Sequence, residues 1–251
     1  MDPILRTENL SMKFGNFLAV NDVSFKLNSN ILQAIIGPNG AGKTTFFNLI
    51  SNYLRATKGS VFFKGINITN LPAHEVSLMG MVRSFQISNV FPGLSVFENL
   101  RVSAQSRGKD NFKMLKHYKT LKKYSEKAEE TAKTVNLYDK LYLEARSLTH
   151  GDQRKLEIGM LLATDPDLLL LDEPTAGMAN EEVPMIIDFI KEIKATQQKT
   201  ILLIEHKIEM VMSISDYITV MQNGIILAEG TPDEIKNNRE VREAYLGRHY
   251  E

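Results

Sequence analysis

Residues 32–48 read LQAIIGPNGAGKTTFFN, and the rest of the chain is organised around this stretch. The apolar run 31–36 predicts a buried strand. A glycine-rich turn follows over 37–42, and Lys43, Thr44 and Thr45 then begin an amphipathic helix. The order is G-x-x-x-x-G-K-T between a strand and a helix, which is the P-loop motif in its required context.

Each residue type in this stretch suits a phosphate chain. Glycines let the backbone wrap an anion with its N–H groups turned inward, and the helix N-terminus adds a partial positive charge. Lys43 can reach the β- and γ-phosphates, and the Thr44 hydroxyl is placed to ligate Mg²⁺. The stretch therefore predicts a nucleotide-binding site formed by Gly37, Pro38, Asn39, Gly40, Ala41, Gly42, Lys43, Thr44 and Thr45.

The composition excludes several other classes of protein. Thirty basic and thirty acidic residues among 251 leave no net charge, so nothing draws the whole chain to nucleic acid. The absence of cysteine excludes disulfides and thiolate metal sites and agrees with a cytosolic location. No apolar run is long enough to span a bilayer, and residues 1–14 lack the order of a signal peptide. We expect a soluble intracellular chain that can still dock on a membrane component.

Strands and helices alternate along much of the chain. Strands 167–171 and 200–204 are too apolar to be half-exposed, which is typical of a parallel sheet covered on both faces. Asn223-Gly224 closes a hairpin, and Thr231-Pro232-Asp233-Glu234 is a capping box that starts the last helix. Further strands are expected at 4–14, 18–27, 60–64, 66–68 and 81–85, and helices at 95–106, within 109–136, from about 151, at 180–196 and up to about 213.

This pattern predicts an α/β fold with a mostly parallel sheet, a P-loop NTPase (RecA-like) core, an antiparallel β subdomain and an inserted helical subdomain. We expect one domain over 1–251. Its core would comprise about 1–87 and 164–251, and its helical subdomain about 88–163.

Four predicted strands end on chemically useful residues: the P-loop, Gln86, Asp172-Glu173 and Glu205-His206. Ligands of open α/β sheets lie beyond the carboxyl ends of the strands, so these groups would converge on the triphosphate. Asp172 would hold Mg²⁺ and Glu173 would polarise the attacking water. Gln86 would contact the metal or that water, and His206 would donate to the γ-phosphate.

Taken singly, these residues also have purely structural interpretations. A histidine after a strand is more often structural, and Asp172-Glu173 before Pro174 could form a polar turn. Their joint placement in a chain with a complete P-loop favours the catalytic interpretation, because the structural one needs four coincidences.

The order P-loop, Gln86, 148–153 (LTHGDQ), 168–173, then His206 resembles an ABC-transporter ATPase subunit along essentially the whole chain. The resemblance implies a head-to-tail dimer that encloses two ATP molecules. It assigns Phe14 to stacking on adenine. It also implies that the signature residues contact the ATP of the opposite subunit; they are Thr149, His150, Gly151, Asp152 and Gln153.

Finer features resemble the longer ATPase subunit of branched-chain amino acid importers. They are the runs 82–86 and 90–96, the insertion near 101–136, the run 173–178 and the tail 229–247. The resemblance implies a second, different ATPase subunit, transmembrane permease subunits and indirectly a solute-binding protein, at the cytoplasmic face of the membrane. Urea and short-chain amide importers share much of this pattern and remain an alternative.

Three positions depart from the family pattern: Thr149 replaces the usual Ser, Asp152 replaces Gln or Glu, and Ala179 replaces Asp or Asn. These departures would weaken the composite site closed by this signature and leave the site built on Lys43, Glu173 and His206 intact. The hypothesis is an asymmetric pair with a different partner subunit.

Residues 107–127 are rich in lysine, which is typical of a solvated helix face; contact with anionic headgroups or permease loops is the alternative. Two further functions remain open for the whole chain. One is a soluble ABC-type ATPase outside transport, against which the single cassette and zero net charge argue. The other is a nucleotide sensor with little turnover.

Overall fold

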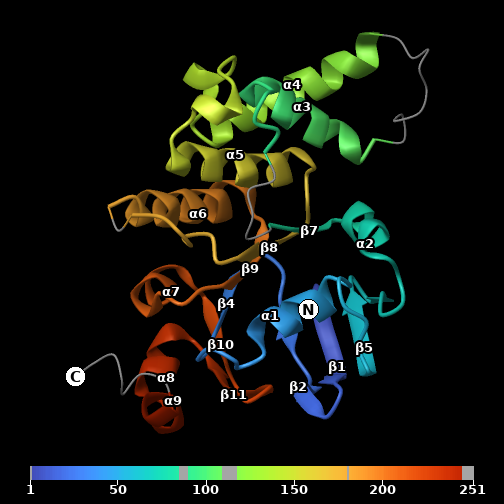
Figure 1. The fold of residues 1–251 in the computed structure, drawn as a ribbon, viewed down its shortest axis with the longest axis vertical. Helices are drawn as coiled ribbons and strands as arrows, with labels where there is room; N and C mark the ends of the chain where they lie inside the picture. Colours follow the sequence, from blue (N-terminus) through green and yellow to red (C-terminus); the bar gives the residue numbers. More distant parts are fainter. Residues whose placement is uncertain (1, 85–89, 109–117, 180, 245–251) are drawn as a thin grey trace.

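The computed structural model describes residues 2–84, 90–108, 118–179 and 181–244 (Figure 1). Gln86, part of the lysine-rich segment and the tail beyond Ala244 lie outside the described residues.

A six-stranded sheet forms the centre of the molecule, in the order β11–β10–β4–β9–β8–β7. All neighbouring strands from β10 to β7 run parallel, and β11 pairs antiparallel with β10. The expected mostly parallel sheet is confirmed. Its strands are β4 (Leu32–Ile36), β7 (Met81–Arg83), β8 (Leu168–Asp172), β9 (Thr200–Ile204), β10 (Tyr217–Gln222) and β11 (Ile225–Gly230).

Both faces of this sheet are buried, which explains why its inner strands are uniformly apolar. Successive side chains of a strand point to opposite faces. Leu169 and Leu171 of β8 therefore enter one hydrophobic core with α6, while Leu168 and Leu170 enter another with α1.

The second sheet is antiparallel throughout, in the order β2–β1–β5–β6 with β3 also paired to β1. Its strands are β1 (Leu5–Phe14), β2 (Phe17–Val23), β3 (Lys26–Leu27), β5 (Lys58–Phe63) and β6 (Ile66–Asn67). The prediction of one strand over 18–27 is wrong. The chain leaves β2 after Val23 and enters β3 at Lys26. Just before this break, Asn9 and Asp22 bond side chain to side chain at 2.9 Å, and both adopt left-handed φ angles (49° and 55°).

Helices cover the central sheet, and α3, α4 and α5 form a separate layer beyond α6 (Figure 1). Ser95 and Glu98 form a capping box that starts α3, and Thr231 with Glu234 forms the predicted one before α8. The helices are α1 (Lys43–Ile50), α2 (Ala73–Met79), α3 (Val96–Ser106), α4 (Tyr118–Thr134), α5 (His150–Ala163), α6 (Val183–Gln197), α7 (Ile208–Ile214), α8 (Pro232–Asn237) and α9 (Arg239–Ala244), with 3-10 turns at Tyr138–Lys140 and Ala145–Ser147.

Candidate active site

The loop between β4 and α1 is shaped by glycines with positive φ. Gly42 precedes α1 with φ 96°, and a Cβ there would lie 2.4 Å from the Ala19 carbonyl oxygen. A Cβ on Gly37 would lie 2.1 Å from the Met221 carbonyl oxygen. Glycine is therefore required at both positions by the protein's own backbone, before any ligand is considered.

The Lys43 side chain lies inside this loop. Its Nζ donates to the carbonyl oxygens of Gly37 at 2.7 Å and Pro38 at 3.0 Å. Burial lowers the pKa of Lys43 from its ordinary 10.5, and the Glu173 and Asp172 carboxylates oppose that shift. The Lys43 ammonium is thus desolvated and bonded only to two neutral carbonyl oxygens among the described residues. A bound phosphate anion would be a stronger partner for this ammonium than either carbonyl.

A cavity of about 280 Å³ opens beside the loop. It is lined by Phe17 and Ala19 of β2, residues 39–45, Glu173 at the end of β8 and His206 after β9. The adjacent parallel strands β4, β9 and β8 therefore deliver the P-loop, an imidazole and a carboxylate to one space.

Glu173 and His206 contact each other directly, with Oε1 and Nε2 2.9 Å apart. An ionised carboxylate can only accept, so Nε2 of the imidazole carries the shared hydrogen. The Glu173 N–H donates to the Ile204 carbonyl at 2.9 Å, and Glu173 adopts φ 49°. This left-handed conformation costs a glutamate about 1–2 kcal/mol, and the bond to β9 helps to hold it.

Asp172 lies one residue earlier, at the end of β8, and is 1% exposed. Its Oδ2 accepts from Arg83 Nη2 at 2.7 Å, and its backbone N–H donates to Ser84 Oγ at 3.0 Å. Its Oδ1 is buried and has no hydrogen-bond partner in the part of the chain that the structure describes. Such an unpaired carboxylate oxygen fits a hard cation such as Mg²⁺, as does the hydroxyl of the exposed Thr44.

A buried carboxylate that the sequence analysis left without a role stabilises this arrangement. Glu205 is 2% exposed. Its Oε1 accepts from the Thr175 N–H at 3.1 Å and from the Thr175 hydroxyl, and its Oε2 accepts from the His206 N–H at 2.8 Å. Glu205 thus ties the segment that carries His206 to the turn after Glu173. The feature of the sequence that could have indicated this role is the position of Glu205 next to His206 at the end of a strand.

Arg154 of α5 makes a second link that the sequence did not suggest. It donates from Nε to the Pro174 carbonyl at 2.9 Å and from Nη2 to the Glu173 carbonyl at 3.2 Å. The helical layer is therefore bonded to the backbone of the turn that carries Glu173.

The signature residues 149–153 lie at the N-terminus of α5, and none is among the described residues that line the cavity. Thr149 caps the helix by accepting from the Asp152 N–H at 3.2 Å. Asp152 is 8% exposed and paired with Lys140. A Cβ on Gly151 would lie 2.4 Å from Met185 Cε. Exposed His150 precedes that glycine, and the Gln153 side chain donates to the Leu148 carbonyl at 3.2 Å.

Among the described residues, four other predicted positions are not in the lining of the cavity: Phe14, Gly37, Pro38 and Asp172. Phe14 pairs across the hairpin with Phe17, and the structure places Phe17 at the cavity. Both residues are aromatic, so the sequence could not show which of them lies at the cavity; the geometry of the hairpin decides it. Gln86 lies outside the described residues, so its position stays a prediction.

The fold and site define a class. A P-loop after a parallel strand, with acidic residues at the end of β8, is the arrangement of a P-loop nucleoside triphosphatase. The family model described as "ABC transporter" matches residues 20–176, and one described as "Branched-chain amino acid ATP-binding cassette transporter" matches residues 226–251. The chain belongs to the ABC transporter family and is an ATP-binding cassette, which is an ATPase domain.

Named relatives are similar over nearly the whole length. The chain is 39% identical to the high-affinity branched-chain amino acid transport ATP-binding protein LivG of Salmonella typhimurium, over 98% of each chain. It is 38% identical to the corresponding protein BraF of Pseudomonas aeruginosa, again over 98% of each.

Solved structures agree with this assignment. The ADP conformation of MJ1267, an ATP-binding cassette of an ABC transporter, superposes with a TM-score of 0.85 at 33% identity, covering 98% of this chain and 100% of that one. A nucleotide-free cassette from an ABC transporter superposes with a TM-score of 0.83 at 36% identity, covering 97% and 98%. The predicted fold and family are confirmed.

Proposed function

We propose that this chain is the ATP-hydrolysing subunit of an importer for branched-chain amino acids or a related small polar solute. The observation that carries the proposal is the single cavity shared by the P-loop, Glu173 and His206. Relatives named as branched-chain amino acid transport proteins support the choice of solute.

Each site residue has a chemical role in this proposal. The backbone N–H groups of 37–42 and the Lys43 ammonium hold the β- and γ-phosphates. Glu173 accepts a proton from the attacking water, and its bond to His206 fixes the carboxylate's orientation. Thr44 and Asp172 would hold Mg²⁺, which when bound neutralises phosphate charge. Gln86 would contact the metal or the water, and Phe14 would stack on adenine together with Phe17.

The proposed assembly is a head-to-tail dimer, with residues 149–153 of one subunit completing the ATP site of the other. A helix N-terminus favours an anion, which supports this use of α5. Asp152 is engaged by Lys140, so its carboxylate is less free to reach across an interface. Together with Thr149 and Ala179, this supports a heterodimer whose two sites differ.

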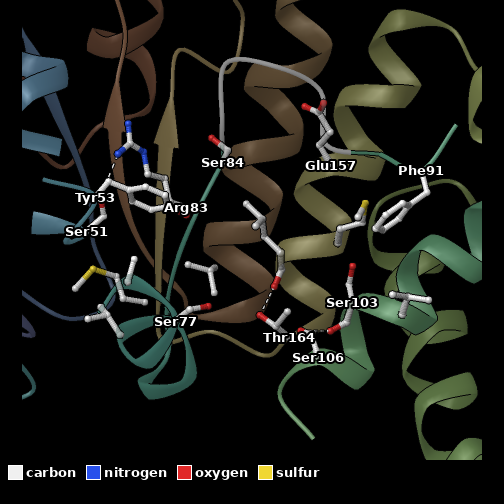
Figure 2. A pocket seen from close by; sticks show the side chains of 17 residues that line it. Ser51, Tyr53, Ser77, Arg83, Ser84, Phe91, Ser103, Ser106, Glu157 and Thr164 are labelled. Carbon is white, nitrogen blue, oxygen red and sulfur yellow. Dashed lines mark hydrogen bonds between the residues drawn. The ribbon is translucent and has the colours of Figure 1, made fainter. Parts of the chain in front are cut away.

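A groove beside α2 and β7 supports a permease contact. It has a volume of about 360 Å³ and lies between α2, β7, α3 and α5 (Figure 2). We call it the subdomain groove; its mainly apolar lining includes Tyr53, Val76, Arg83, Phe91, Val102 and Met160. We propose that it takes a cytoplasmic segment of the permease and that it marks the boundary between the core (about 1–87 and 164–251) and the helical subdomain (about 88–163).

None of the described helices is long and apolar enough to cross a bilayer. We propose that the permease holds the chain peripherally at the cytoplasmic face of the membrane, and the relatives named as transport ATP-binding proteins support this location. A solute-binding protein on the other side would select the solute.

The test is to purify the complex from its native membrane, identify the co-purifying subunits and measure ATP hydrolysis by the chain alone and in the complex. The proposal predicts transmembrane partners, a second ATPase subunit and faster turnover in the complex, increased further by a branched-chain amino acid with its binding protein. Equal turnover without membrane partners would support a soluble ATPase instead. Negligible turnover in both states would support a nucleotide sensor. Stimulation by urea or short-chain amides alone would identify these compounds, and not branched-chain amino acids, as the transported solute.

A further inference from the structure

Arg83 connects the candidate metal ligand to two other parts of the molecule. Its guanidinium donates to Asp172 Oδ2 at 2.7 Å, to Asn48 Oδ1 at 2.6 Å and to Ser51 Oγ at 3.0 Å. The Arg83 and Asp172 side chains are only 8% and 2% exposed. The end of β8 is thereby bonded to α1, the helix that follows the P-loop.

The same side chain forms part of the wall of the subdomain groove. Figure 2 shows the Arg83 guanidinium close to the Tyr53 ring, and the guanidinium carbon lies 5.6 Å from the centroid of that ring. It lies 5.5 Å from the centroid of the buried Phe47 ring of α1. Packing between two aromatic rings and bonding to three oxygens restrict the guanidinium to one orientation.

The two oxygens of Asp172 have different environments. Oδ2 is occupied by Arg83, while Oδ1 is buried without a hydrogen-bond partner among the described residues. A buried carboxylate oxygen left unpaired carries a desolvation cost that a bound cation would relieve. Because Oδ2 is fixed by a charged partner, the carboxylate cannot rotate to satisfy Oδ1 elsewhere.

We propose that Arg83 is a positioning residue, which holds Asp172 from the wall of the subdomain groove so that Oδ1 remains available to Mg²⁺. This inference rests on the proposed ATPase function. It adds that Arg83, which lines the subdomain groove and bonds Asp172, links a partner bound in the groove to the metal ligand. Arg83 acts through Asp172 and does not itself touch the nucleotide in this proposal.

An argument from charge alone predicts the opposite effect of removing Arg83 on metal affinity, which makes the proposal testable. A guanidinium near a cation site repels the cation, so its removal should tighten metal binding. Loss of positioning should instead weaken it. Residues that orient a metal ligand typically contribute about 10–100-fold to metal affinity.

The experiment measures Mn²⁺ binding to the full chain saturated with a non-hydrolysable ATP analogue, from the spin-resonance signal of free Mn²⁺. Arg83→Lys keeps the charge but replaces the planar guanidinium fork, which matches Asp172, Asn48 and Ser51, with a single ammonium, and Arg83→Gln removes the charge. Both variants should bind Mn²⁺ about tenfold or more weakly, while metal-free binding of the analogue stays within about twofold. Arg55→Lys, at an exposed position, is the matched control.

Wild-type Mn²⁺ affinity in Arg83→Lys, or tighter binding in Arg83→Gln, would overturn the role of Arg83. A lower melting temperature with unchanged Mn²⁺ affinity would show a merely structural role and overturn it too. If the Arg83 variants do not fold, the double variant Asn48→Ala, Ser51→Ala releases Arg83 from α1 and must still weaken Mn²⁺ binding. Failure of the wild-type chain to bind the analogue at all would instead refute the proposed function.

Discussion

His206 Nε2 lies 2.9 Å from Glu173 Oε1, joining the end of β9 to the end of β8. The two side chains are 40% and 22% exposed, so the contact borders the open cavity and is not locked in the core. Glu173 reaches it from a left-handed backbone conformation, φ 49°. A left-handed conformation at a glutamate that lines the cavity is consistent with a carboxylate positioned for chemistry.

Glu173→Gln should separate ATP binding from hydrolysis. The amide keeps the size of the side chain but cannot accept a proton, so phosphate release should fall by about 10²–10⁴-fold. ATP should remain bound, and size-exclusion chromatography with ATP and the second ATPase subunit should show a dimer. Glu181→Gln, at an exposed position on the same loop, is the control and should hydrolyse ATP normally. A monomer with ATP bound would argue against the two-subunit site.

Glu205→Gln should reduce both stability and turnover. Both carboxylate oxygens accept from donors, so an amide nitrogen in either place would face an N–H group. The expected loss is about 1–3 kcal/mol of unfolding free energy, measured by urea denaturation. ATP hydrolysis should also fall, because Thr175 and His206 lose their common anchor. The exposed Glu209→Gln on α7 is the control, and equal midpoints for the two variants would refute this role.

Two glycines of the P-loop should differ in their tolerance of alanine. Gly40 (φ 79°) and Gly42 (φ 96°) both carry a left-handed penalty, but a Cβ on Gly40 would meet no protein atom within 4 Å. On Gly42 it would lie 2.4 Å from the Ala19 carbonyl oxygen. Gly42→Ala should therefore cost about 1–3 kcal/mol of unfolding free energy more than Gly40→Ala. Urea denaturation of both variants tests this, and equal costs would contradict the close packing of the loop on β2.

ATP binding should take up protons at alkaline pH. Burial lowers the pKa of Lys43 below 10.5 in the nucleotide-free chain, and phosphate anions favour the charged form. ATP affinity should therefore fall as pH rises through the lowered pKa. Between that pKa and 10.5 the unfolded state binds more protons, so the stability of the nucleotide-free chain should rise with pH.

Calorimetry in two buffers of different ionisation enthalpy measures the proton uptake. Lys43→Arg keeps its charge throughout this range and should show no uptake, which makes it the control. Equal uptake by both proteins would assign the proton to another group.

The sequence by itself determined the P-loop, the buried strands, the capping box at Thr231–Glu234 and the hairpin at Asn223-Gly224. These features are local: glycine conformations, runs of apolar residues and caps are encoded within a few neighbouring positions. The order of strands and their polar ends was also enough to expect Glu173 and His206 beside the P-loop, because parallel strands bring their carboxyl ends to one edge.

Only the tertiary structure decided which side chains pair across that edge. Arg83 and Asp172 are 89 residues apart and Thr175 and Glu205 are 30 apart, and neither pairing follows from a local pattern. The same holds for the break between β2 and β3 at Ser24 and Phe25, and for the bond between Asn9 and Asp22 next to it. Side-chain partners at such separations depend on strand register and packing. The alternation of apolar and polar residues predicts only which face of the sheet a side chain lies on.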